Sequence, residues 1–195
     1  RMLTRLLFVW FIKQKGLIPE ELFDVEKLEN NILTELNPVR QDGLFAEMSK
    51  ESVYYKAILQ NLFFASLNCP IKPQSGDEDK RERGFRRKKN YGDDFGNDWL
   101  FRYEKYFKDP DGFVELINSK VPFLNGGLFE CLDDKANKKY IDGFSDNLPK
   151  PDRLIVPDYL FFGKDESVDL SEDYGDTSPQ YKHTSVKGLI NILKT

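Results

Sequence analysis

The chain has 195 residues and a formal net charge of −4, with 39% hydrophobic and 32% charged residues. This length and balance predict one soluble globular domain with a core of its own, and they exclude collagen-like and disordered chains. No apolar run approaches the ~18 residues of a membrane-spanning helix, because the longest, residues 6–12, has seven.

Cysteine and histidine are scarce. Cys69, Cys131 and His183 give no zinc-binding spacing and no disulfide framework, and His183 is expected to be an ordinary exposed histidine. Such cysteine usage is typical of a cytosolic protein, so we expect a cytoplasmic location. The chain enters an apolar segment directly after Arg1, without the cleavage region of a signal peptide, and ends inside a helix-like stretch. We therefore expect a piece of a longer polypeptide.

The sequence lacks the motifs of several common enzyme classes. No two of its thirteen glycines are separated by a single residue, which excludes the G-x-G turn that binds dinucleotides or an adenosyl group. Gly163-Lys164 is followed by Asp165 rather than by Ser or Thr, so a P-loop is excluded as well. No Pro-Pro dipeptide is present for the loop of an amino methyltransferase. We assign no catalytic residue and no metal site.

Two acidic patterns remain to be weighed. Residues 78–80 and 133–135 match the short part of a metal-dependent nuclease motif, but both lie among polar loop formers, so we interpret them as chance matches. An independent magnesium-dependent nuclease using Glu78 and Lys80 is an alternative that requires a strand in this segment. Six acidic residues between positions 165 and 176 lack the spacing of a calcium loop and predict a solvated loop.

The first third of the chain predicts a helical core over residues 1–69. Residues 3–13 form a helix that is apolar nearly all round and therefore expected to be buried, with docking to a neighbouring domain as the alternative that an exposed patch would mark. Gly16 ends this helix, and Pro19 opens a second helix with apolar positions from Leu22 to Leu28. A further helix is expected to follow through Ile32, Leu33 and Leu36. Residues 53–67 give the strongest helical pattern, with Ser49 or Ser52 as its cap.

The remaining segments predict helices followed by irregular structure. Residues 70–97 read as a basic loop or insertion, 98–120 as helices that complete the core around a turn at 109–112, and 121–184 as loops and short strands. Residues 185–195 begin a helix that leads into the next domain. The predicted fold class is mainly α with a smaller irregular short-strand (α+β) C-terminal portion, a helical connector-type domain.

Four segments together carry a resemblance to a known family: residues 5–16 (RLLFVWFIKQKG), 56–68 (KAILQNLFFASLN), 121–130 (VPFLNGGLFE) and 155–162 (IVPDYLFF). In this order they resemble the region upstream of the methylase core in bacterial type IIG restriction-modification polypeptides, which fuse an endonuclease to an adenine-N6 DNA methyltransferase. The resemblance implies either a connector between these domains or an N-terminal helical part of the methylase unit. S-adenosylmethionine and magnesium are implied only for the whole polypeptide, and no catalytic residue is carried over.

The basic segment 80–89 is the predicted DNA-contacting region. It has seven basic residues and one acid, and its cations would neutralise backbone phosphates without reading sequence. The candidates are Lys80, Arg81, Arg83, Arg86, Arg87, Lys88 and Lys89. The expected function is a non-catalytic connector that touches DNA and the neighbouring nuclease and methylase domains. A protein-interaction scaffold without DNA contact is the alternative. Asn125, Gly126 and Gly127 are predicted to form a tight structural turn.

Overall fold

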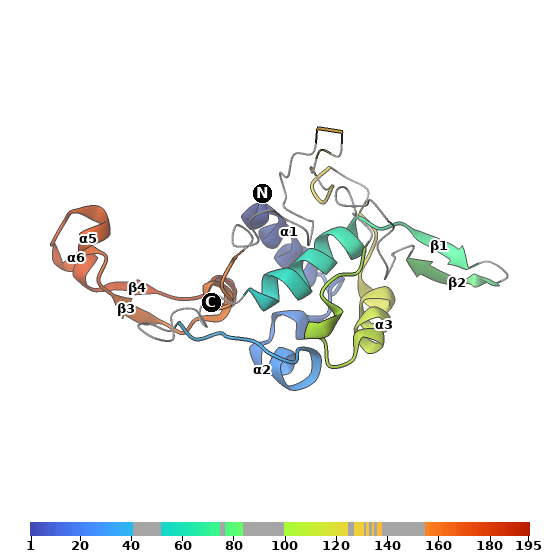
Figure 1. Cartoon of the computed structure of the whole chain (residues 1–195), viewed down its shortest axis with the longest axis horizontal. Helices are drawn as coiled ribbons and strands as arrows, with labels where there is room; N and C mark the ends of the chain where they lie inside the picture. The colour runs from blue at the N-terminus through green and yellow to red at the C-terminus, as the bar shows by residue number, and fades with distance from the viewer. Residues whose placement is uncertain are drawn as a thin grey trace.

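The computed structural model describes residues 1–40, 52–74, 77–83, 100–124, 127–130, 132, 134, 136–137 and 155–195. Over these ranges the chain is mainly helical, and its strands form two separate antiparallel pairs, which confirms the expected fold class. Figure 1 shows most of the helices gathered in a central body, with one strand pair extending from each side of it and α5 and α6 at the tip of the β3–β4 arm. None of the helices in the described ranges combines the length and apolarity needed to span a bilayer.

The elements fall into the body and two extensions. The N-terminal part of the body contains α1 (Met2–Gln14), the 3-10 helix η1 (Glu20–Phe23), α2 (Val25–Lys27) and the π helix η2 (Leu28–Ile32). The rest of the body contains the π-helical η5 (Tyr54–Leu59) and η6 (Asn61–Leu67), the 3-10 helix η7 (Glu104–Tyr106), α3 (Pro110–Lys120), α4 (Tyr159–Phe162) and α7 (Leu189–Leu193). The extensions contain β1 (Ile71–Gln74) and β2 (Asp77–Arg83) on one side, and β3 (Glu166–Val168), α5 (Ser171–Tyr174), α6 (Pro179–Lys182) and β4 (Thr184–Val186) on the other.

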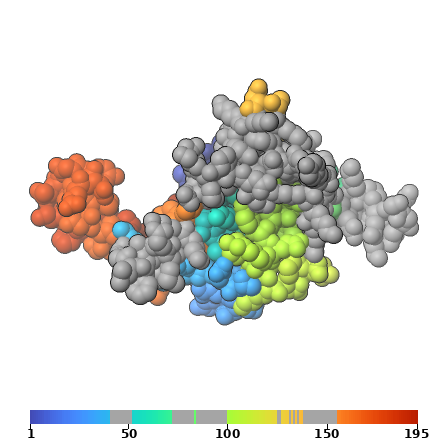
Figure 2. Space-filling model, viewed as in Figure 1, coloured from blue at the N-terminus to red at the C-terminus, as the bar shows by residue number. Residues whose placement is uncertain are grey.

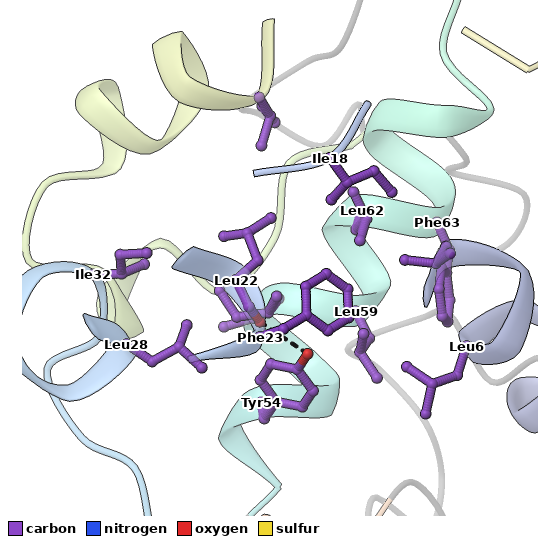
Figure 3. Packing of buried hydrophobic residues seen from close by; sticks show 14 of the residues in the cluster. Leu6, Ile18, Leu22, Phe23, Leu28, Ile32, Tyr54, Leu59, Leu62 and Phe63 are labelled. Carbon is purple, nitrogen blue, oxygen red and sulfur yellow. Dashed lines mark hydrogen bonds between the residues drawn. The ribbon is translucent and has the colours of Figure 1, made fainter. Parts of the chain in front are cut away.

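A central helix over residues 53–67, made of η5 and η6, organises the core. The predicted extent of this helix is confirmed, and every residue from 57 to 67 is buried. Its hydrogen bonds are mostly of the wider π type, which apolar periodicity does not reveal. Figure 3 shows Tyr54, Leu59 and Leu62 packed against Leu22 and Phe23 of η1, with the Tyr54 hydroxyl donating to the Leu22 carbonyl at 2.9 Å.

Replacing Tyr54 with phenylalanine tests this contact. Burial, and secondly the nearby Asp158, raises the pKa of the Tyr54 phenol well above its ordinary value of 10.0. The unfolded chain therefore loses this proton above about pH 10 while the folded chain keeps it, so Tyr54 costs stability as pH rises further. We expect Y54F to be less stable by about 1 kcal/mol at pH 8, from the lost hydrogen bond, and this gap to narrow at pH 11. Urea unfolding of both proteins at the two pH values measures the gap, and a constant gap would contradict the prediction.

Helix α1 forms as predicted but is not buried nearly all round. Arg5, Leu6, Val9 and Ile12 face the core, whereas the opposite face is exposed. The expectation of a fully covered helix is therefore wrong for this face, because the described part of the body packs on one side of α1 only. The exposed apolar side chains of the helix are Leu3, Leu7, Phe8 and Phe11.

The two helices predicted after Pro19 form as three short helical pieces, η1, α2 and η2. Pro19 precedes the 3-10 turn η1. Asp24 has an extended backbone, and its carboxylate accepts a hydrogen bond from the Lys27 N–H and so caps α2. The further helix, which corresponds to η2, ends at Ile32 rather than at the predicted Leu36. Leu33 instead forms an isolated antiparallel bridge with Phe107, so long-range pairing ends the helix.

The segment 98–120 differs from its prediction in two places. Residues 101–103 are not helical, and Tyr103 has a φ of +59°, a left-handed conformation that interrupts a helix. The expected turn at 109–112 is the start of α3: Asp109 accepts from the Gly112 N–H at 3.0 Å, and Pro110 occupies the first helical position. The helix predicted after this turn is confirmed as α3, and its residues Phe113 and Ile117 are buried.

Residues 71–83 and 185–186 also correct the prediction. The expected loop contains a hairpin at β1–β2, and Ser185 and Val186 lie in β4, so the last helix begins at Leu189. The short strands predicted within 121–184 are represented by β3, whereas residues 159–162 form α4. His183 is exposed, as expected.

The four segments that carry the family resemblance pack together in the body. The Arg5 guanidinium donates to the carbonyls of Leu128 and Glu130 at 2.7 and 2.9 Å, and it lies 4.8 Å from the centre of the Phe64 ring. Asp158 reaches the start of the central helix and accepts from the Tyr54 N–H at 2.8 Å. The segments are thus parts of one architectural unit.

Candidate functional site

The β1–β2 hairpin carries the described part of the basic segment. The two strands are antiparallel, with Ile71 opposite Arg83 and Pro73 opposite Arg81. Figure 1 shows this hairpin extending away from the helical body. Each strand of a two-stranded sheet is an edge strand, and a proline is tolerated there. An isolated hairpin of this kind is marginally stable, so it needs an anchor at its base.

Arg83 supplies that anchor. Its side chain is 6% exposed, and one guanidinium nitrogen donates to the carbonyls of Ser66 at 2.6 Å and Cys69 at 3.4 Å, while the other donates to the carbonyl of Val121. Burial lowers the pKa of Arg83 from 12.5 to about 10. Arg83 therefore joins the hairpin to the end of the central helix and to the end of α3, and it is not part of an exposed basic surface.

The other predicted DNA-contacting residues fall into two groups. Lys80 and Arg81 lie on β2, farther along the hairpin than Arg83. Four lie outside the described residues: Arg86, Arg87, Lys88 and Lys89. Of the predicted tight turn, Asn125 and Gly126 also lie outside the described residues, whereas Gly127 lies in a turn close to the buried Phe129.

The nuclease alternative requires a strand around Glu78 and Lys80, and the structure has one there. Glu78 and Lys80 lie on a strand, β2, which the sequence pattern did not predict. Over the part of the chain that the structure describes, no group of three or more His, Cys, Asp or Glu side chains is arranged to hold a metal ion. The strand therefore keeps the alternative open to a direct test of cleavage.

The second extension, the C-terminal arm (residues 164–187), frames an apolar groove. Figure 2 shows the tip of this arm as a lobe that stands away from the body. The rings of Tyr174 and Tyr181 stack in this lobe with their centres 4.9 Å apart. At the base of the arm, the Gly188 N–H donates to the Gly163 carbonyl at 2.8 Å. A side chain at Gly188 would lie 2.5 Å from the Phe161 carbonyl, so glycine permits this close approach.

The groove has a volume of about 520 Å³ and lies between the start of α1, α4 and the base of the C-terminal arm. Its apolar lining includes Leu3, Leu160, Val168, Leu170, Val186 and Leu189. Charged side chains of both signs also line it: Arg40, Lys164 and Lys187 against Glu166 and Asp173. Such a groove suits an apolar side chain or segment of a partner better than a charged substrate.

Sequence reasoning missed this groove and the anchoring role of Arg83. The groove combines residues 2–3, 40, 156–173 and 186–189, and no local pattern joins segments so far apart. The sequence did contain a sign of the exposed face of α1. Residues 3–13 are apolar nearly all round, and such a helix suits a docking surface as well as a core.

Comparison with protein-family models, curated proteins and solved structures finds no match to this chain.

Proposed function

We propose that this chain is a non-catalytic connector that touches the DNA backbone, in a bacterial restriction-modification polypeptide of the fused endonuclease and adenine-N6 methyltransferase type. The β1–β2 hairpin is the observation that carries the DNA contact. It extends from the body, it is fixed at its base by Arg83, and it places Lys80 and Arg81 beyond that anchor. Lysine and arginine on an extended hairpin neutralise phosphates independently of base sequence.

The connector role rests on the packing of the four resembling segments into one body. A packed body with a hairpin on one side and an arm on the other would set the spacing between two neighbouring domains. S-adenosylmethionine and magnesium would be bound by those neighbouring domains, and the polypeptide would act in the cytoplasm, where bacterial DNA lies.

Binding to a labelled 25-base-pair duplex of arbitrary sequence tests the DNA contact. We expect the double variant K80A/R81A to bind about tenfold more weakly at 50 mM salt, and the added substitutions R86A, R87A, K88A and K89A to weaken binding further, equally on unrelated duplexes. Each lost phosphate contact should reduce the slope of log affinity against log salt by about 0.9. Fluorescence anisotropy measures both quantities.

The matched control removes two exposed lysines elsewhere, Lys27 of α2 and Lys194 after α7. If K27A/K194A weakens binding as much as K80A/R81A, or if neither does, the hairpin has no DNA role. Magnesium-dependent nicking of a plasmid by the chain, lost in Glu78→Gln, would replace the proposal with the nuclease alternative.

The scaffold without DNA contact is favoured by one observation, the exposed apolar face of α1. Such a face suits protein contact, and a connector can have both properties.

A further inference from the structure

The outward face of α1 presents an apolar stripe, formed by Leu3, Leu7 and Phe11. These side chains are 52%, 52% and 57% exposed, and their spacing of four residues places them in one row along the helix. At a rise of about 1.5 Å per residue, the stripe is about 12 Å long. Phe8 lies beside it, 39% exposed, with the edge of its ring against Phe129. A monomer gains nothing by exposing three large apolar side chains in one row.

The α1 segment that carries the stripe has only positive charges, whereas the groove at its start has charges of both signs. Residues 1–19 contain four basic residues and no acidic residue. Two of these cations are already engaged: Arg5 is buried on backbone carbonyls, and Lys13 lies 2.9 Å from the Glu20 carboxylate. Arg1 and Lys15 are exposed, and the Lys15 ammonium lies 5.6 Å from the centre of the Phe11 ring. The stripe is therefore bracketed by an exposed cation at each end of α1.

The stripe continues into the apolar groove. Met2 and Leu3, at the start of α1, line the groove, and Leu160 of α4, 46% exposed, lies on its wall. A partner helix that packs along α1 could therefore insert an apolar side chain into the groove at the end of the stripe.

We propose that α1 docks an acidic amphipathic helix of a protein partner. The partner's apolar side chains pack on Leu3, Leu7 and Phe11, one of them enters the groove, and its carboxylates lie opposite Arg1 and Lys15. Charge decides against a second copy of this chain pairing through α1, because that arrangement brings like charges together. The proposal goes beyond the DNA contact and does not depend on it.

Two labelled helical peptides serve as probes, and fluorescence anisotropy follows their binding to the full chain. Both have leucine at heptad positions a and d; one has glutamate at the flanking e and g positions and the other has lysine there. We expect the glutamate peptide to bind at least tenfold more tightly than the lysine peptide. L7S/F11S should weaken its binding at least tenfold, and R1E/K15E should abolish the preference between the peptides.

The matched control replaces two side chains of comparable exposure on other helices, Tyr174 and Ile192, with serine. Y174S/I192S should bind as the unaltered chain does, and circular dichroism melts establish that each variant is folded. Equal binding of both peptides, or no effect of L7S/F11S, would overturn the proposal. So would a dimer in sedimentation velocity that L7S/F11S dissociates, or binding to phosphatidylglycerol vesicles where neither peptide binds.

Discussion

Replacing Asp158 with alanine is expected to lower the free energy of unfolding by about 3 kcal/mol, which corresponds to a fall of about 10 °C in melting temperature for a chain of this size. Asp158 is fully buried, and its two carboxylate oxygens accept from different segments. One accepts from the Tyr54 N–H at 2.8 Å and the other from the Asn37 N–H at 3.2 Å. Truncation leaves the buried Tyr54 N–H and the partly buried Asn37 N–H without this acceptor.

The position of this carboxylate explains the size of the effect. The first N–H groups of a helix have no partner within the helix, and a negative charge is favoured at that end. Asp158 meets both needs of the central helix from 104 residues away in the chain. Ser52 and Val156 reinforce the junction, since the Ser52 hydroxyl donates to the Val156 carbonyl at 3.0 Å and accepts from its N–H at 2.9 Å.

Thermal melts of three variants separate this role from a general loss of charge. Asp158→Asn keeps one oxygen acceptor and should lose about half as much stability as Asp158→Ala. Asp173→Ala removes an exposed acidic residue of α5 and should melt within about 1 °C of the unaltered chain. If D158A also melts within that range, Asp158 does not cap the central helix.

The local pattern of apolar residues was sufficient to predict two of the helices in the body. The segment 53–67 is apolar on nearly every side and is followed by Pro70 and Pro73, so both its helical state and its extent were predictable. The helix α3 was predictable from its apolar residues as well. Its start was misread as a turn, because Asp109 and Pro110 are typical of a turn and of a helix start alike.

Contacts between residues far apart in the chain account for the places where the structure differs from the sequence-based prediction. Sequence pattern offered Ser49 or Ser52 as the cap of the central helix, but the Tyr54 N–H is satisfied by Asp158. It predicted a further helix through Leu36, but Leu33 pairs with Phe107. Neither partner is visible within a window of local sequence, because each is brought in by the packing of the whole body.

The sequence predicted which residues carry the positive charge of the candidate site, but it did not predict the hairpin on which some of them lie. The concentration of positive charge at 80–89 is a property of sequence, whereas β1 and β2 lack the alternating apolar residues that predict strands. The hairpin depends on Arg83, whose burial could not be inferred from its place in a basic run.

Replacing Arg83 with methionine is expected to release the hairpin from the body. Methionine keeps an apolar stem of similar length but removes the donors to the carbonyls of Ser66, Cys69 and Val121. Leaving these buried acceptors unpaired should cost about 2 kcal/mol, offset in part because a buried charge is also removed. Backbone amides of β1 and β2 should therefore exchange hydrogen at least tenfold faster, with a smaller change over residues 57–67.

Arg83→Lys distinguishes charge from hydrogen-bond geometry. Lysine keeps the positive charge but lacks the planar fork that lets guanidinium nitrogens reach carbonyls on two sides, so we expect its hairpin amides to exchange nearly as fast as those of Arg83→Met. If Arg83→Lys behaves like the unaltered chain, charge alone anchors the hairpin.

The same variants connect the anchor to the proposed DNA contact. Arg83 is buried and faces backbone carbonyls, so its loss removes no phosphate contact. Arg83→Met should nevertheless weaken duplex binding several-fold, because a released hairpin must be ordered again when its cations meet the phosphates. The slope of log affinity against log salt should stay close to that of the unaltered chain, whereas K80A/R81A should reduce it. A reduced slope in Arg83→Met would instead mean that Arg83 itself contacts DNA.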